Sequence, residues 1–152
     1  MGERLSYRWL FAAVNDSGGT LMSVMKSRHI HNGWRPLALF SKGEARLDRV
    51  VKDVVLTECR DKSLHDWAQP LSESRYWVEA LCPVGGLVCD PFLGSGTVPT
   101  AVALVGGKRR FLGCEIDPAT VKIARRRVAE ALAGQGEREE VPSGRVLTAR
   151  NR

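Results

Sequence analysis

The stretch LVCDPFLGSGT at residues 87–97 decides the fold of this chain of 152 residues. Its first three residues are apolar, as expected for a strand that is buried on both faces of a parallel sheet. Asp90 and a Gly-Ser-Gly-Thr loop follow, and the apolar run at 98–105 predicts a helix that ends at a pair of glycines. Because such a loop places open backbone and free helical N–H groups next to a ligand, it predicts a nucleotide-type site.

A second strand and a second helix follow the glycine loop. Residues 110–115 (RFLGCE) predict the strand, and Asp117 with Pro118 predicts the start of a helix that continues to Leu132, Asp117 acting as its cap. The order strand, loop, helix, strand, helix is typical of a right-handed βαβ unit. The three arginines at 125–127 are expected near the C-terminal end of this helix, where their charge suits the helix dipole.

Glu115 marks the second half of the predicted site. It lies 21 residues after Gly94, at the end of the next strand, where a carboxylate can accept hydrogen bonds from both hydroxyls of a ribose. Dinucleotides and S-adenosylmethionine both bind at such a crevice. Pro99 replaces the third glycine of the dinucleotide loop, and Asp90 suits a cationic sulfonium better than a pyrophosphate, so the residues favour S-adenosylmethionine. A helix-capping turn with a merely solvated Glu115 stays open as the alternative.

The rest of the chain divides by pattern near residue 64. The part before the glycine loop is expected to form strands at residues 5–14 and 36–41 and a helix at 71–81. Residues 44–64 are expected to form an exposed loop with one short strand. We therefore expect a first unit, a βαβ unit with its preceding helix, and a loosely ordered tail, at residues 1–64, 65–133 and 134–152.

Composition excludes several classes of protein. Hydrophobic residues make up 43% and charged residues 26% of the chain, which argues against a disordered or fibrous protein. There is no apolar run of membrane-spanning length and no secretory core near Met1, so we expect a cytoplasmic protein. The four cysteines form no CxxC pair, and we expect Cys89 and Cys114 to be reduced core residues, so no metal site is predicted.

Three motifs of this chain together carry a family resemblance. They are DPFLGSGT at 90–97, RFLGCEIDP at 110–118 and ARRR at 124–127. They closely resemble the amino-group DNA methyltransferases, which modify adenine or the N4 atom of cytosine, in the group whose catalytic segment precedes the cofactor segment. The resemblance covers roughly residues 5–132 and implies an α/β, Rossmann-like fold with a mixed sheet. It also implies S-adenosyl-L-methionine as the cofactor and DNA as the partner.

The resemblance further implies which residues bind the cofactor. Glu115 would bind the ribose and Ile116 would lie against the adenine, although Ile116 and Phe92 can equally well pack in the core. The segment HDWAQP at 65–70 resembles the family's segment that holds the methionine end of the cofactor, but it lacks the usual lysine. The cofactor-binding residues implied in this way are His65, Gln69, Pro70, Asp90, Pro91, Phe92, Gly94, Ser95, Gly96, Thr97, Glu115 and Ile116.

The family's base-binding tetrapeptide is missing from these residues. It has the form Asp/Asn/Ser-Pro-Pro-aromatic, and no two prolines are adjacent in this chain, so its catalytic residues stay unknown. Relative to the family we expect an N-terminal truncation and an incomplete sheet that lacks its central catalytic strands. The strand at 87–89 would then expose an unpaired edge, which favours self-association or pairing with a second chain.

A basic stretch in the first unit is a candidate DNA contact. Lys26, Arg28 and Arg35 would meet DNA phosphates, although a plain solvated loop explains them equally well. The net charge is +6, and the segment 1–64 holds eleven basic and seven acidic residues. The family resemblance implies that the chain is the cofactor-binding portion of an S-adenosylmethionine-dependent DNA methyltransferase. The alternative is an inactive remnant or an accessory module that binds DNA or a partner chain.

Overall fold

The computed structural model describes residues 4–15, 22–25, 30–44, 47, 49–57 and 69–139. Three of the predicted site residues, His65, Lys26 and Arg28, lie outside these ranges. No helix in the described part of the chain is long and apolar enough to span a membrane.

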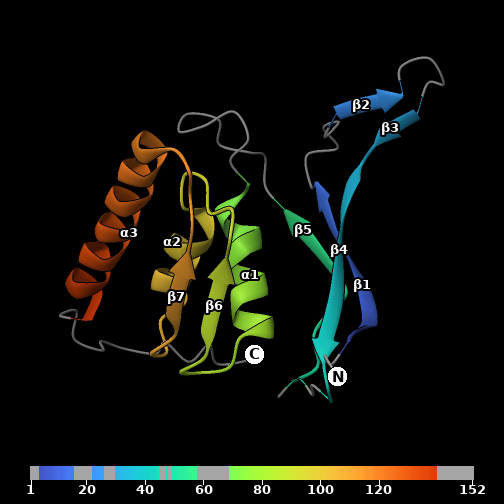
Figure 1. Cartoon of the computed structure of the whole chain (residues 1–152), viewed down its shortest axis with the longest axis horizontal. Coiled ribbons are helices and arrows are strands. Elements are labelled where there is room, and N and C mark those ends of the chain that lie inside the picture. The colour runs from blue at the N-terminus through green and yellow to red at the C-terminus, as the bar shows by residue number, and fades with distance from the viewer. Residues whose placement is uncertain are drawn as a thin grey trace, which may run out of the picture.

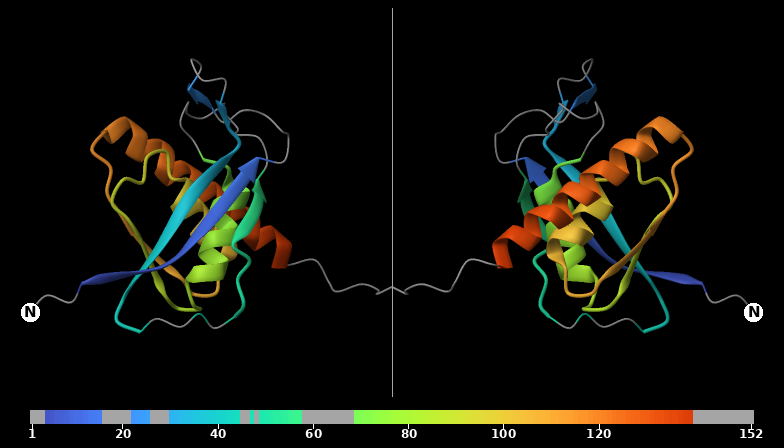
Figure 2. Two further views of the ribbon diagram at one scale, coloured as in Figure 1. Left: turned by 90° about the vertical axis from the view of Figure 1, so that its right-hand side faces the viewer. Right: turned by 90° about the vertical axis from the view of Figure 1, so that its left-hand side faces the viewer.

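The first half is built around one long antiparallel pair. Strand β1 (Leu5–Asn15) pairs along its length with β4 (Trp34–Lys42), and at its far end it pairs in parallel with β5 (Val54–Thr57). The twisted β1–β4 pair is visible in both views of Figure 2. Strands β2 (Met22–Met25) and β3 (Ile30–Asn32) form a separate antiparallel pair. The strands predicted at 5–14 and 36–41 are confirmed, and β5 is the short strand expected within residues 44–64.

The second half is the βαβ unit that the glycine loop predicts. Helix α1 (Leu71–Leu81) is followed by β6 (Leu87–Asp90), α2 (Thr97–Val105), β7 (Arg110–Gly113) and α3 (Pro118–Glu139). Strands β6 and β7 are parallel, with Leu87 opposite Arg110 and Asp90 opposite Gly113. Figure 1 shows α2 and α3 beside this strand pair.

Helix α3 is longer than predicted. It continues to Glu139, so residues 134–139 are helical, and the arginines at 125–127 lie in the middle of the helix instead of near its end. The prediction of a loosely ordered segment from residue 134 was wrong for this stretch. A glycine costs only about 1 kcal/mol in a helix interior, which the good helix formers around Gly134 and Gly136 can offset.

Helix α1 joins the two halves of the chain. On one side the ring of its Trp77 packs against Phe11 of β1, with ring centroids 5.0 Å apart. On the other side its Val78 is buried with Ala101 and Val102 of α2, and Val88 and Phe111 of the β6–β7 pair pack against this cluster. The hydrophobic core of the second half therefore extends through α1 to the first sheet.

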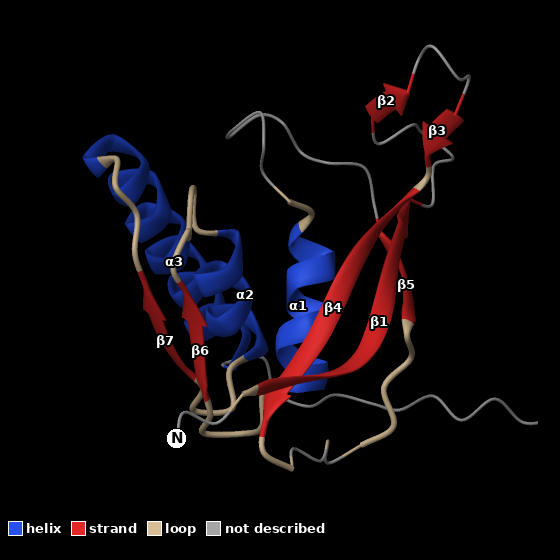
Figure 3. Cartoon of the chain, turned by 45° about the vertical axis from the view of Figure 1, so that its right-hand side comes forward, coloured by secondary structure: helices blue, strands red, loops and turns tan. Residues whose placement is uncertain are grey.

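The sheet is incomplete, as the family resemblance implies. In the described part of the chain the strands form three separate ladders, so β6 pairs only with β7 and β4 only with β1. Figure 3 shows β4 and β6 as the facing strands of their two sheets, with α1 behind the space between them. A cavity of about 470 Å³ lies here and is lined by Leu37 of β4, Trp77 of α1 and Val88 and Cys89 of β6, among others.

One face of the β6–β7 pair is not covered by any helix in the described part of the chain. Val88 and Phe111 point to the helices, whereas Leu87 and Leu112 on the opposite face are 51% and 58% exposed. Cys89 and Cys114 are exposed as well, so the prediction that they are core residues was wrong. Cys89 is exposed because it lies opposite Leu112, on the face that the described helices leave open.

The contact between Trp77 and Phe11 contributes to the stability of both halves of the chain. Replacing Trp77 by Ala should lower the free energy of unfolding by about 3 kcal/mol, because it removes the aromatic contact between the two halves. Trp77→Phe is the matched control. It keeps the ring and deletes the buried indole N–H, which has no hydrogen-bond partner in the described part of the chain. We expect a clearly smaller loss for Phe in urea denaturation followed by circular dichroism; equal losses would contradict this role.

Candidate functional site

The glycine loop between β6 and α2 has the shape that its sequence predicts. Gly94 and Gly96 have φ angles of 53° and 84°, a region that residues with a Cβ atom rarely adopt. Ser95 and Thr97 are buried, at 5% and 7% exposure. A Cβ atom built on Gly94 would have no neighbour nearer than 4.0 Å, so the backbone there is open to a ligand.

The Glu115 carboxylate ties the two loops of the site together. Its Oε2 atom accepts a hydrogen bond of 3.0 Å from the Gly94 N–H, and its Oε1 atom accepts one of 3.0 Å from the Asp117 N–H. Glu115 follows β7 and Gly94 follows β6, so adjacent parallel strands place both at the same edge of the sheet. Each carboxylate oxygen can accept more than one hydrogen bond, which leaves capacity for a ligand hydroxyl. We call this arrangement of residues 90–97 and Glu115 the cradle.

Two apolar side chains flank the cradle without packing into the core. Phe92 is 88% exposed and Ile116 is 96% exposed. Of the two explanations that the sequence left open, core packing is therefore excluded for both residues in the described part of the chain. Asp90 contributes to the loop itself, since its Oδ1 atom accepts a hydrogen bond of 3.0 Å from the Phe92 N–H.

Asp117 caps helix α3, as predicted. Its carboxylate accepts hydrogen bonds from the N–H groups of Ala119 and Thr120, at 3.1 and 3.0 Å, and from the Thr120 hydroxyl at 2.5 Å. These hydrogen bonds, that of the Thr120 hydroxyl above all, hold the pKa of Asp117 below its ordinary value of 3.8. The Asp117 carboxylate therefore binds the N-terminus of α3, next to Glu115.

Pro99 fits the start of helix α2 for a simple reason. It is the third residue of a helix that begins at Thr97, where a backbone N–H has no partner within the helix. Thr100 is the first residue of this helix that donates back to the loop, with its N–H 3.1 Å from the Gly96 carbonyl oxygen. A proline therefore costs the helix no hydrogen bond at this position.

Helix α3 holds the loop from the other side, which the sequence did not predict. A Cβ atom on Gly96 would lie 2.8 Å from the Cα atom of Ala124, so α3 rests directly on the loop. Nη1 of Arg127 donates hydrogen bonds to the Ser95 carbonyl oxygen at 2.9 Å, the Ser95 hydroxyl at 3.2 Å and the Thr97 hydroxyl at 3.3 Å. An arginine within a run of three carries no sequence signal that singles it out, which explains why this contact was missed.

The remaining predicted residues in the described part of the chain lie at α1 and β4. Pro70 directly precedes α1, and Gln69 lines the cavity between β4, α1 and β6 together with Cys89. Arg35 forms an ion pair with Glu73 of α1, and its side chain is 19% exposed. The structure thus places the charge of Arg35 against α1 and not on an open basic loop.

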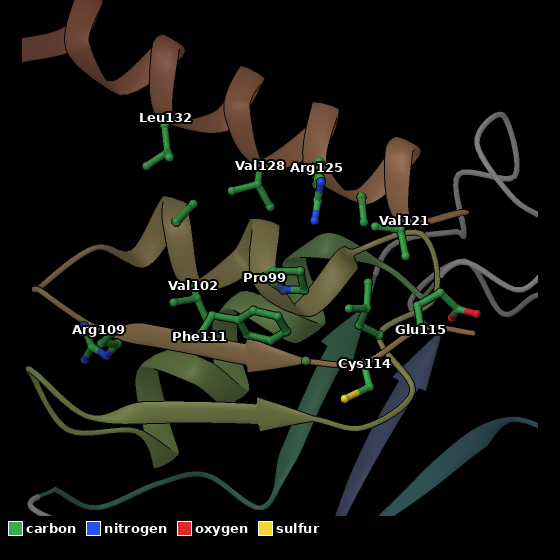
Figure 4. A pocket seen from close by; sticks show the side chains of 14 residues that line it. Pro99, Val102, Arg109, Phe111, Cys114, Glu115, Val121, Arg125, Val128 and Leu132 are labelled. Atoms are coloured by element: carbon green, nitrogen blue, oxygen red, sulfur yellow. The ribbon is translucent and has the colours of Figure 1, made fainter. Parts of the chain in front are cut away.

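A second cavity, of about 690 Å³, lies between α2, α3 and β7. Figure 4 shows Val102, Phe111 and Leu132 around it, with Glu115 at its rim. Its walls are mainly apolar, and of residues 90–97 only Leu93 lines it. The cavity therefore meets the cradle at Leu93 and Glu115 and extends from there between the two helices and β7.

Replacing Gly96 and Gly94 by Ala separates two costs. Both variants force an alanine into a positive φ, which costs about 1 to 2 kcal/mol. Gly96→Ala also drives a methyl group into Ala124, and such overpacking adds about 1 to 3 kcal/mol. Urea denaturation should therefore show the larger loss for Gly96→Ala. If both variants lose the same free energy of unfolding, α3 does not rest on the loop as described.

Comparisons with known proteins identify the fold and the family of this chain. A search of curated proteins finds no match. Among solved structures, the complex of M1.HpyAVI with S-adenosylmethionine has a TM-score of 0.66 at 17% identity, covering 82% of this chain and 63% of that one. A protein of Thermus thermophilus described as a DNA modification methylase, complexed with S-adenosyl-L-methionine, has a TM-score of 0.63 at 18% identity, covering 86% and 56%. PvuII DNA methyltransferase (cytosine-N4-specific) has a TM-score of 0.61 at 16% identity, covering 82% and 55%.

These structural likenesses establish the fold, and the chain spans less than two thirds of each of these three proteins. A family model described as DNA methylase, for N6 and N4 methyltransferases, matches residues 7–126. The match includes both halves of the chain and the whole cradle. The chain therefore belongs to the DNA methylase family of N6 and N4 amino-methyltransferases.

Proposed function

We propose that this chain is the S-adenosylmethionine-binding portion of a DNA methyltransferase that modifies the exocyclic amino group of adenine or cytosine. One observation carries the proposal: Glu115 and the glycine loop are hydrogen-bonded into one cradle at the carboxyl ends of two parallel strands. Ligands of open α/β sheets bind at this edge. Family membership and two similar structures, both of them complexes with this cofactor, support the same ligand.

The residues of the cradle fit this cofactor chemically. The Glu115 oxygens can accept hydrogen bonds from ribose hydroxyls while they hold the loop. Phe92 and Ile116 offer exposed apolar surface on which an adenine ring can lie. Asp90 places a carboxylate next to a ligand whose sulfonium and ammonium groups are positive, and such a charge would repel a pyrophosphate. We assign these four residues to the cofactor, together with the backbone at Gly94.

The chemistry then divides between cofactor and protein. S-adenosylmethionine supplies, when bound, a methyl group on a sulfonium that an exocyclic amine can attack directly. Glu115 would hold the ribose hydroxyls, and the loop between Gly94 and Thr97 would keep the cofactor at the edge of the sheet. DNA is the substrate that the family implies, and we place the protein in the cytoplasm, where it would meet DNA and the methyl donor. The base-binding tetrapeptide has no counterpart among these 152 residues, so none of them is assigned to the target base.

A calorimetric titration with S-adenosylmethionine tests the cradle. We expect binding in the micromolar range, weakened about tenfold or more by Glu115→Gln, because loss of a charged acceptor removes about 1.5 to 3 kcal/mol of hydrogen bonding. Glu130→Gln is the matched control on the exposed surface of α3, where Glu130 only pairs with Arg126. A folded chain that binds no S-adenosylmethionine would overturn the proposal and would favour the accessory module.

The proposal includes a partner strand on the outer edge of β6. The amide N–H groups of Arg110 and Cys114 donate to the carbonyl oxygens of Gly86 and Asp90, so alternate residues of β6 face β7. The backbone groups of Leu87 and Cys89 therefore point away from β7, to the open edge. Strand β4 is a poorer acceptor of a new strand, because it contains Pro36, which lacks an N–H. We infer that β6 receives a strand from a second polypeptide, which in a purified sample is a second copy.

Substitutions at Cys89 test this edge without touching the ladder to β7. Cys89→Pro removes the outward N–H, whereas Cys89→Ala shortens the side chain and keeps it. In sedimentation velocity the wild type and the Ala variant should both associate as their concentration rises, and the Pro variant should stay monomeric at the same concentrations. A wild type that remains monomeric throughout would remove the partner strand from the proposal and leave the cofactor site unaffected.

A further inference from the structure

The cradle is restrained by an arginine that no part of the proposed function uses. Nη1 of Arg127 reaches three oxygen atoms of the loop, two on Ser95 and one on Thr97, at 2.9 to 3.3 Å. These are charge-assisted hydrogen bonds, the stronger class in proteins. Because Ser95 and Thr97 are 5% and 7% exposed, the guanidinium acts where water hardly competes.

Arg127 and Ala124 together form the surface of helix α3 that contacts the loop. Ala124 lies three residues before Arg127, so the two share one face of the helix. Ala124 is 5% exposed and lies directly against Gly96. Arg127 donates hydrogen bonds to Ser95 and Thr97, the residues on either side of that glycine. The helix thus contacts the loop through one small side chain and one long one.

The neighbouring arginines do not share this position. The Arg126 side chain is 64% exposed and pairs with Glu130 one turn further along the helix, at 3.7 Å. Arg125 is exposed and lines the cavity between α2, α3 and β7. Of the three, Arg127 is the one that reaches Ser95 and Thr97, and Arg126 provides a control of equal charge on the exposed side of the same helix.

The loop needs such a restraint for a physical reason. Two glycines with positive φ lie within three residues, and glycine loses more conformational entropy on ordering than any other residue. A ligand that binds a mobile loop must order it, which weakens binding, whereas a loop that is already ordered spares that cost. Glu115 holds one end of the loop at Gly94, and Arg127 holds the other end at Ser95. Arg127 approaches the loop from its buried side, whereas the backbone at Gly94 is open to a ligand.

We propose that Arg127 is a positioning residue that holds residues 95–97 in the shape that binds S-adenosylmethionine, without touching the ligand. The inference rests on the proposed cofactor site. Electrostatics alone would act in the opposite direction: the ligand carries a net positive charge, so removal of a nearby cation would tighten its binding. A weaker affinity in an uncharged variant therefore reports on the shape of the loop.

The test compares Arg127→Gln and Arg127→Lys with Arg126→Gln in the full chain. In calorimetric titration with S-adenosylmethionine, Arg127→Gln should raise the Kd about tenfold, in proportion to the loss of charged hydrogen bonds. Arg127→Lys should recover part of the affinity, because an ammonium can still donate to one or two of the three oxygens. Arg126→Gln should stay close to wild type. Thermal unfolding of each variant shows that the titrated sample is folded.

Amide hydrogen exchange without ligand provides a second readout. The N–H groups of Gly94 and Gly96 are hydrogen-bonded, to Glu115 and to the Leu93 carbonyl oxygen. Arg127→Gln should speed their exchange while amides in α1 keep theirs, and Arg126→Gln should change neither. Unaltered affinity and exchange in Arg127→Gln would overturn the inference. A wild type that binds no S-adenosylmethionine would overturn the cofactor site instead, and the exchange data would still decide whether Arg127 orders the loop.

Discussion

The packing of Trp77 against Phe11 is the contact on which the arrangement of the two halves depends. The two sheets share no ladder hydrogen bonds in the described part of the chain, so their relative position is set by side chains of α1. An ion pair between Arg35 and Glu73 and a hydrogen bond from the Tyr76 hydroxyl to the Lys52 carbonyl oxygen support the same helix from the first half. Without α1 the βαβ unit that carries the cradle would lose its contact with the first sheet.

The glycine loop of the cradle is held from two sides by charged side chains. Strands β6 and β7 end at the same edge, and each contributes one loop. A carboxylate from the second loop holds the first at Gly94, and a guanidinium from the following helix holds it at Ser95 and Thr97. The groups that fix the loop are buried or half-buried, whereas Phe92 and Ile116, which are available to a ligand, are exposed. The residues that hold the loop in place therefore differ from the exposed residues that a ligand can contact.

Much of this arrangement can be predicted from sequence, because local rules govern it. Glycines with positive φ, a proline in a first helical turn and an aspartate cap fix the ends of α2 and α3, and the bounds of α1 follow from its apolar spacing. The contacts that were missed are long-range. Nothing local distinguishes Arg127 from Arg126, or shows that Arg35 meets Glu73 across 38 positions. The exposure of Cys89 was also mispredicted, because an apolar strand signals burial on both faces and the described elements cover only one.

The position of α1 also bears on how cooperatively the chain unfolds. The β1–β4 pair and the βαβ unit each hold most of their hydrogen bonds internally, and a single helix connects their cores. Proteins open in contiguous units of this kind, with separate free energies for each. A ligand in the cradle would stabilise its own unit by mass action, and the first sheet would gain only what α1 transmits. Ligand binding would then divide one melting transition into two, one for each half of the chain. The two halves would separate at the contact between Trp77 and Phe11.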